Sequence, residues 1–414
     1  MNQFLAGVKK RTLSVWNIPM FPILFLMNFL LGLSMAFITP YYSLFGIGEV
    51  GMSNMSFGIF MTAMSLSGVI ISTYLGKLSD RNVSRKLILI ITTVAAIIGF
   101  GSFAFIRSYF LLLLIAVFLL GIATATVPQL WAYAREALKK TDVPEKETPY
   151  VMNVFRMFFA LAWTVGPALA AWVLLLAGFT GLFLFAAFCY ALSLVVILIA
   201  FKEVPNAVTT QQEPVNLRKF IAKPHIFANI AAFLLLTMAT SMNMMNIPIY
   251  VTQILGGTEM HVGIIYSIPP IFEVPLMIWI GILATRVDNR ILIKIGFLLS
   301  VIYFFLLSFV TTPWQIYPLQ IISAAQVSIT MGIAVTYFQN FLPKEPGTAT
   351  TLYMNTNKLG QMLGFLFFGI IATYLGYQGV FIVCTALAGV GFLILLLFGK
   401  EKMNDNTLDE RVGA

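Results

Sequence analysis

Charged residues are scarce in this 414-residue chain, where Lys, Arg, Asp and Glu together make up 10% of the sequence, against about 25% in an average soluble domain. Hydrophobic residues make up 59%, and the mean hydropathy is +0.92. This balance excludes a protein whose whole surface faces water. Apolar stretches near or above the roughly 20 residues that cross a hydrocarbon core recur about twelve times. The sequence therefore predicts an all-α membrane protein with twelve transmembrane helices.

Cysteine and histidine are also few. Cys189 and Cys384 lie far apart inside apolar runs, so neither a disulfide framework nor a metal cluster is expected. His225 and His261 are isolated at span edges and do not have the spacing of metal ligands. The sequence contains no P-loop motif, and no paired acid or activated nucleophile at membrane depth. We therefore expect no metal, no cofactor and no enzyme activity.

The net charge of +9 does not indicate a nucleic-acid partner, because the basic residues gather at alternate connections between the apolar stretches. Examples are the N-terminal Lys9, the cluster from Arg81 to Lys86, and Arg135. Five other connections contain no Lys or Arg, namely those near residues 43–55, 177–182, 255–260, 311–314 and 374–378. This positive-inside pattern predicts a multi-pass protein of the cell (inner) membrane with both termini in the cytoplasm.

Two sets of six apolar stretches organise the chain. The first set predicts helices near 18–42, 56–75, 86–105, 109–134, 150–176 and 181–201. The second set predicts helices near 226–255, 261–285, 290–310, 314–341, 348–374 and 379–399. The most polar segment lies between them. We expect an N-terminal six-helix bundle of residues 1–201, a cytoplasmic linker of residues 202–224, and a C-terminal bundle of residues 225–414 with a short cytoplasmic tail.

A short motif is repeated in the two halves. The sequence Gly-Lys-Leu-Ser-Asp-Arg from Gly76 to Arg81 is followed by Arg85, and Gly-Ile-Leu-Ala-Thr-Arg from Gly281 to Arg286 is followed by Arg290. The glycine, the leucine and both arginines recur at equal offsets. A duplicated six-helix unit explains the repeat, and it predicts two pseudo-symmetric bundles.

The stretch GKLSDRNVSRK, which starts at Gly76, resembles the cytoplasmic signature that joins helices two and three of the major facilitator superfamily. It departs from the signature because the usual glycine after the Asp-Arg pair is absent and the following basic pair is displaced by one residue. An acid beside basic groups makes charge-assisted bonds that hold a gate in one state. The alternative is ordinary charge of a cytoplasmic loop. The candidate gate residues are Gly76, Asp80, Arg81, Arg85 and Arg135.

One acid lies well inside an apolar span, and this is Glu273. A charge at that depth costs roughly 3 kcal/mol on the mildest insertion scale, so we expect Glu273 to carry a proton. The alternative is that it only neutralises a buried cation. The cations within spans are Arg156 in the fifth and Lys358 in the eleventh. The resemblance implies that helices five and eight are neighbours across the two halves, so Arg156 and Glu273 are expected to meet and to exchange partners during coupling.

Uncharged polar groups recur at helical spacing, which predicts a polar cavity. Asn243, Asn246 and Tyr250 share one face of the seventh span. Amides and phenols that donate and accept hydrogen bonds suit a neutral polyhydroxylated ligand. The alternative is that these amides bond helix to helix, at about 1 to 2 kcal/mol each. The full set of candidate binding residues is Gln129, Trp131, Asn243, Asn246, Tyr250, Gln326, Tyr353, Asn355 and Asn357.

Several passages resemble the bacterial sugar efflux transporter family within that superfamily. They are residues 128–136 in the fourth span, Arg156 with residues 162–167 in the fifth, residues 337–340, and residues 347–353 with Asn355. The resemblance implies export of sugars such as lactose, glucose or thiogalactosides in exchange for protons by alternating access. We expect the transporter to be a monomer. A multidrug exporter of the same fold remains the alternative, and a non-transporting membrane sensor is a third reading.

Overall fold

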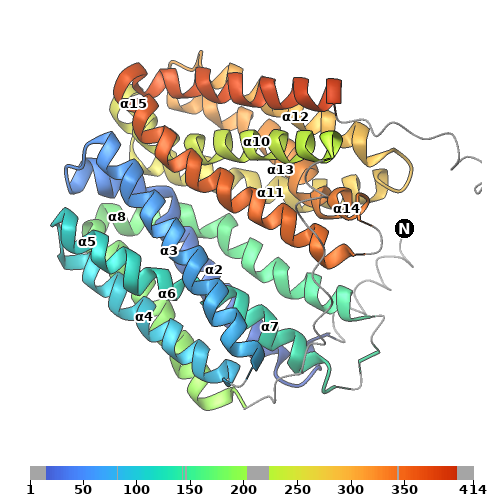
Figure 1. Ribbon diagram of the computed structural model, residues 1–414. Helices are drawn as coiled ribbons and strands as arrows, with labels where there is room; N and C mark the ends of the chain where they lie inside the picture. Colours follow the sequence, from blue (N-terminus) through green and yellow to red (C-terminus); the bar gives the residue numbers. More distant parts are fainter. Residues whose placement is uncertain are drawn as a thin grey trace, which may run out of the picture.

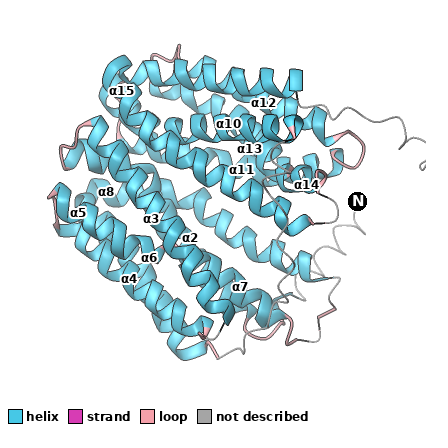
Figure 2. Cartoon of the chain, in the orientation of Figure 1, coloured by secondary structure: helices cyan, strands magenta, loops and turns pink. Residues whose placement is uncertain are grey.

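The structure, a computed structural model, describes residues 15–81, 83–141, 143–144, 147–202, 223–342 and 345–398. Every regular element in these ranges is a helix (Figure 2). The N-terminal half contains α2 (Phe21–Ile38), η1 (Thr39–Tyr41), η2 (Leu44–Glu49), α3 (Asn54–Arg81), α4 (Arg85–Phe105), α5 (Tyr109–Ile115), η3 (Ala116–Leu120), α6 (Gly121–Ala123), α7 (Thr126–Leu138) and α8 (Thr148–Ala200). The C-terminal half contains α10 (Pro224–Ile249), η5 (Tyr250–Ile254), α11 (Glu259–Leu283), α12 (Asn289–Leu307), η6 (Pro313–Gln315), α13 (Ile316–Gly332), α14 (Ala334–Gln339) and α15 (Pro346–Phe398). The predicted linker, residues 202–224, falls almost entirely outside the described residues.

Ten helical stretches of the described chain are long and apolar enough to cross a membrane. Two of them, in α8 and α15, run for 51 and 53 residues, and each is bent at one glycine. Gly178 has φ 60° and Gly376 has φ 68°, a left-handed conformation that residues with a Cβ rarely adopt. Each long helix therefore comprises two crossing segments, which accords with the predicted twelve. The connections expected at 177–182 and 374–378 are replaced by single-residue bends.

Other predicted helices are continuous in the sequence pattern but interrupted in the structure. The stretch predicted at 226–255 is an α-helix to Ile249 and then the π-helix η5. The stretch predicted at 314–341 breaks at Ile333, and the one at 109–134 contains the π-helix η3. Hydropathy has no signal for these changes of hydrogen-bond register. One cause lies in α10, where Pro248 lacks the N–H that would bond the carbonyl of Met244.

The two halves form separate bundles that meet at one end and diverge toward the other (Figure 1). We call these the contact end and the basic end, because Arg85, Arg135 and Arg290 lie at the second. At the contact end, Tyr377 Oη donates to Asn54 Oδ1 at 2.9 Å and joins α15 to α3. The N–H of Ala168 donates to Ser267 Oγ at 3.2 Å and joins α8 to α11.

Glycines allow the closest approach at the contact end. A Cβ added to Gly369 of α15 would lie 2.6 Å from the Asn54 carbonyl oxygen and 3.1 Å from the Cα of Gly58. The backbones of α3 and α15 are therefore in direct contact, with no room for a side chain between them. Helix interfaces in membranes are enriched in small residues for this reason.

The duplication predicted from the repeated motif extends to local geometry. Gly51 and Gly256 both have positive φ, are 205 positions apart, and each follows a π-helix, η2 or η5. Gly178 and Gly376, the two bends, are 198 positions apart. The halves thus share a scaffold even where their side chains differ.

Candidate functional site

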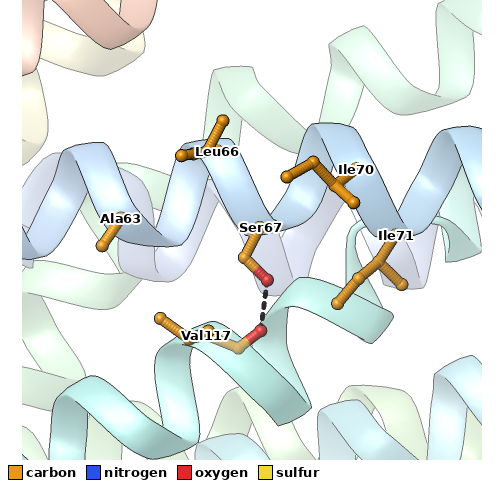
Figure 3. Close-up of a pocket in the computed structure, with 6 residues that line it drawn as sticks. All are labelled: Ala63, Leu66, Ser67, Ile70, Ile71 and Val117. Atoms are coloured by element: carbon orange, nitrogen blue, oxygen red, sulfur yellow. Dashed lines mark hydrogen bonds between the residues drawn. The ribbon is translucent and has the colours of Figure 1, made fainter.

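The groove between α3 and η3 is not the candidate site. It is lined by Ala63, Leu66, Ser67, Ile70, Ile71 and Val117, and its one polar side chain, Ser67, already donates its hydroxyl to the Val117 carbonyl (Figure 3). The residues that line this groove offer apolar contacts, and their one polar side chain is already hydrogen-bonded. The chemistry of the chain lies with polar and charged residues on other surfaces.

Lys358 lies on the surface of α15 that faces α3. Met362, Phe365 and Gly369 follow it at four, seven and eleven positions, which is one helix face. That face contacts α3, because Thr62 Oγ1 donates to the Met362 carbonyl at 3.3 Å and Gly369 meets Asn54. Lys358 is one turn beyond the last of these contacts, toward the basic end, and its side chain is exposed.

Glu273 lies on the face of α11 that carries Tyr266, seven positions earlier. Tyr266 Oη donates to the Met244 carbonyl at 2.7 Å, the same carbonyl that Pro248 leaves unbonded. This face of α11 is therefore directed toward α10. From the other side, Ser328 Oγ of α13 donates to the Glu273 backbone carbonyl at 3.3 Å. Glu273 is half-buried between these helices.

Glu273 and Lys358 lie at about the same depth of the C-terminal half. Tyr266 meets α10 at Met244, and Glu273 is seven positions, or about 10 Å, farther toward the basic end. The same distance along α10 leads from Met244 to Thr237. Thr237 Oγ1 donates to Asn357 Oδ1 at 2.7 Å, beside Lys358. A carboxyl and an ammonium group therefore flank α10 at one level.

Arg156 belongs to a cluster in the N-terminal half that contains Asn28 and Trp131. The Asn28 amide donates to the Phe155 carbonyl at 2.7 Å and accepts the Trp131 Nε1–H at 3.0 Å. The Arg156 guanidinium lies 5.1 Å from the centre of the Trp131 ring. Asn28 is fully buried, Trp131 is half-buried and Arg156 is exposed. These contacts tie α2, α7 and α8 together around one indole ring.

Arg156 and Glu273 do not pair in this conformation. In the described part of the chain, no carboxylate oxygen lies within 4.0 Å of the Arg156 or Lys358 nitrogens. From the contact of Ala168 with Ser267, Arg156 is twelve positions toward the basic end and Glu273 only six. The difference of six residues is about 9 Å along the helices. The predicted meeting requires the diverging ends to approach.

Arg85, one of the gate candidates, is the centre of a hydrogen-bonded cluster at the basic end. Its Nε donates to Glu136 Oε1 at 2.7 Å, and its Nη1 donates to Ser79 Oγ at 2.7 Å and to Gln129 Oε1 at 3.1 Å. These bonds join α3, α4 and α7 within the N-terminal half. Gln129, which the sequence analysis assigned to the binding cavity, is buried in this cluster. Its side chain therefore contacts Arg85 and Ser79 and not the surface that carries Trp131.

The remaining gate candidates are less constrained. Arg135 is exposed. A Cβ added to Gly76 would meet nothing within 4 Å, so no other helix of the described chain approaches this glycine closely in this conformation. The side chains of Asp80 and Arg81 lie outside the described residues.

Asn243, Asn246 and Tyr250 share a face of α10 as expected, but that face points into the C-terminal bundle. Asn246 Nδ2 donates to the Tyr377 carbonyl at 2.8 Å, and Tyr250 Oη donates to the Val310 carbonyl at 2.9 Å. All three side chains are buried. In α13, Gln326 is buried and accepts the Ser300 hydroxyl at 2.8 Å. Asn246 and Gln326 therefore bond helix to helix, which is the alternative to a binding role, and Tyr250 bonds the connection that follows α12.

The start of α15 divides between core and surface. Tyr353 is buried with its ring 5.9 Å from that of Phe233. Asn357 is half-buried and accepts from Thr237, and Asn355 is exposed. Asn28 and Thr237, which bond Trp131 and Asn357, fall outside the spacing patterns of the sequence. A lone polar residue in an apolar span carries no spacing pattern, so the only signal for Asn28 was its polarity.

A family model described as Major Facilitator Superfamily matches the chain over residues 24–357 and 230–412. Among curated relatives, a Deinococcus radiodurans protein provisionally named a sugar efflux transporter is 34% identical and covers 87% of this chain and 92% of its own length. Sugar efflux transporter C of Escherichia coli K12 is 28% identical over 91% of this chain and 95% of its own. The multidrug resistance protein MdtG of Dickeya zeae is 20% identical over 92% and 95%.

Solved structures show the same fold. A variant of the nucleoside transporter NupG superposes with a TM-score of 0.77 at 16% identity, covering 91% of this chain and 99% of its own. A bacterial homologue of the human lysosomal transporter Spinster superposes with a TM-score of 0.73 at 13% identity, covering 94% and 96%. Within the described residues, no three His, Cys, Asp or Glu side chains gather as metal ligands.

Proposed function

Because this chain is a membrane transporter that belongs to the major facilitator superfamily, and within it to the sugar efflux transporters, we propose that it exports sugars or related small polyhydroxylated solutes in exchange for protons. The observation that carries the proposal is the cluster of Asn28, Trp131 and Arg156, in a chain related to sugar efflux transporters over nearly its whole length. The cluster presents an aromatic ring whose orientation is fixed by a buried amide. The polarised C–H groups of a sugar ring pack against such an aromatic face.

The charge inside the spans favours a neutral solute over the alternative, a lipophilic cationic drug. Arg156 and Lys358 are both exposed within spans, one in each half. A bound organic cation would meet two fixed positive charges, and such like-charge contacts act against a partner. The multidrug relative is also more distant, at 20% identity against 34%.

Alternating access follows from the way the halves meet. If the basic end faces the cytoplasm, as the positive-inside pattern predicts, this conformation is open to the cytoplasm and closed outside by the contacts of α3 with α15 and of α8 with α11. Rocking of the two bundles would exchange these contacts for others at the basic end. The cluster of Arg85 and Glu136 lies where such a gate would form.

Proton coupling rests on Glu273 in this proposal. A carboxyl between helices of the C-terminal half changes its charge when it gains or loses one proton, and charge decides whether it attracts Arg156 across the interface. The ionised form favours closure of the basic end around an ion pair. The protonated form releases Arg156. Lys358, at about the same depth, is a second cation whose field acts on Glu273.

Proteoliposomes that contain the purified protein test this function. An imposed pH gradient is expected to drive uptake of labelled lactose or a thiogalactoside, whereas ethidium uptake is not driven. Glu273→Gln is expected to abolish the dependence on the gradient but to retain sugar exchange at equilibrium. The matched control is Glu49→Gln, which removes an exposed acid at the contact end that pairs with Arg107. Driven ethidium uptake without sugar uptake would favour the multidrug alternative, and gradient-driven uptake by Glu273→Gln would remove the proton role.

A further inference from the structure

The indole of Trp131 offers a ligand its face and not its N–H. The Nε1–H is already donated to Asn28, which is fully buried and also donates to the Phe155 carbonyl. The ring is thus fixed in orientation by a residue that cannot itself reach a ligand. The ring of Phe159 stands at 88° to it and supports the indole from the side.

One face of the ring is already occupied by a cation. The Arg156 guanidinium lies 5.1 Å from the ring centre, and no carboxylate in the described part of the chain lies within 4.0 Å of it. The face of an aromatic ring is negative and its edge positive, so both a cation and the polarised C–H groups of a sugar ring seek the face. Two such groups exclude each other from one face.

We propose that the Trp131 face is the sugar platform of the N-terminal half, that sugar and Arg156 compete for it, and that Asn28 is the positioning residue that holds the ring. This inference rests on the proposed function and deepens it. A sugar that stacks on the indole displaces the guanidinium. The displaced Arg156 then becomes the partner of Glu273 across the interface.

Competition between the sugar and Arg156 for the Trp131 ring would couple sugar binding to proton release. When Arg156 leaves the ring and pairs with Glu273, the carboxyl gives its proton to water at the open end. When the sugar departs, Arg156 returns to Trp131 and Glu273 takes up a proton again. The helices packed against α11, which are α8, α10 and α13, contain no Asp or Glu in their described residues, and their cationic side chains are Arg156 and His225. His225 is in the first turn of α10, at the basic end, so Arg156 is the partner within the span.

Binding of labelled lactose to the purified protein tests the competition. Arg156→Gln removes the competitor, so the lactose Kd is expected to fall by about 2- to 5-fold, the range of an exposed cation–π contact. Trp131→Ala is expected to raise the Kd more than tenfold. The matched control is Arg107→Gln, because Arg107 also lies over a ring, at 5.2 Å from the centre of Phe45, but at the contact end. Its Kd should equal that of the wild type.

Two further readouts separate the proposal from simpler roles. Lactose added to weakly buffered wild-type protein is expected to release protons, as followed with a pH dye, and to release none from Arg156→Gln. Asn28→Ala is expected to weaken binding in the wild type but not further in Trp131→Phe, which keeps a ring and lacks the N–H that Asn28 accepts; a merely structural Asn28 would give additive effects.

The outcomes distinguish the two levels of inference. Wild-type protein that binds neither lactose nor a thiogalactoside would overturn the proposed function itself. Sugar binding that weakens in Arg156→Gln would make Arg156 a sugar ligand and overturn the competition. Unchanged proton release in Arg156→Gln would overturn the link to Glu273.

Discussion

The substitution Gly369→Ala tests whether the glycine contact holds the contact end closed. A Cβ at this position would lie 2.6 Å from the Asn54 carbonyl oxygen, where ordinary contacts begin near 3.4 Å, so α3 and α15 must separate by about 0.8 Å. Overpacking of this kind destabilises a packed arrangement by about 1 to 3 kcal/mol. The strain disappears when the contact end opens. The open form should therefore gain by about 5- to 150-fold over the closed form.

Spin labels on cysteines placed at Ser53 and Thr311 would report the separation of the two halves at the contact end. Both positions are exposed, one in each half, and the two native cysteines are buried. In Gly369→Ala the long-distance population is expected to rise, and sugar exchange to slow. Gly389→Ala is the matched control, since a Cβ there meets nothing within 4 Å on the same α15. Distance distributions for Gly369→Ala that match both the wild type and this control would refute the reasoning.

Three other outcomes follow from the described contacts. Tyr377→Phe removes the bond to Asn54 and is expected to shift the same spin-label distances toward opening by about 2- to 12-fold, the value of one hydrogen bond. Arg85→Gln leaves Glu136 buried without its cation and should destabilise the protein by about 3 to 5 kcal/mol, read as a lower Tm in detergent that a second change, Glu136→Gln, partly restores. Asn246→Ala should lower the Tm with little change in lactose Kd, because its amide bonds helix to helix.

Much of the architecture is encoded in features that do not depend on packing. Hydropathy locates the spans, and the motif repeated at Gly76 and Gly281 predicts the duplication that the bends at Gly178 and Gly376 then display. The bond of the gate candidate Arg85 with Ser79 is also local, because the two residues are six positions apart. These properties are set by residues close together in the chain.

The direction of a helix face is not encoded in this way. Periodicity correctly puts Asn243, Asn246 and Tyr250 on one face, but whether it faces a neighbouring helix or an open surface depends on how α10 is rotated in the bundle. For the same reason, the sequence pattern placed Gln129 among the candidate binding residues, whereas in the structure its side chain contacts Arg85. The contact of Trp131 with Arg156 joins two helices and has no counterpart in spacing along the chain.

The duplication also shows where the halves have diverged. With the offset of 205 positions that relates Gly51 to Gly256, Asn28 corresponds to Phe233; with the offset of 198 that relates the bends, Phe155 corresponds to Tyr353. In the N-terminal half, the buried Asn28 amide bonds the Phe155 carbonyl. In the C-terminal half, the corresponding residues Phe233 and Tyr353 pack their rings with centres 5.9 Å apart. One packing position therefore supports a fixed polar site in one half and an apolar core in the other.

By the same offsets, Arg156 corresponds to Met354 and Glu273 corresponds to Gly68. Each of these two charged residues therefore has an uncharged counterpart at the equivalent position of the other half. Arg156 and Glu273 lie in different halves, so the attraction of this pair is available only between the halves. The strength of this attraction depends on how close the two bundles are at the basic end. Coupling between proton binding and the conformation requires such a dependence.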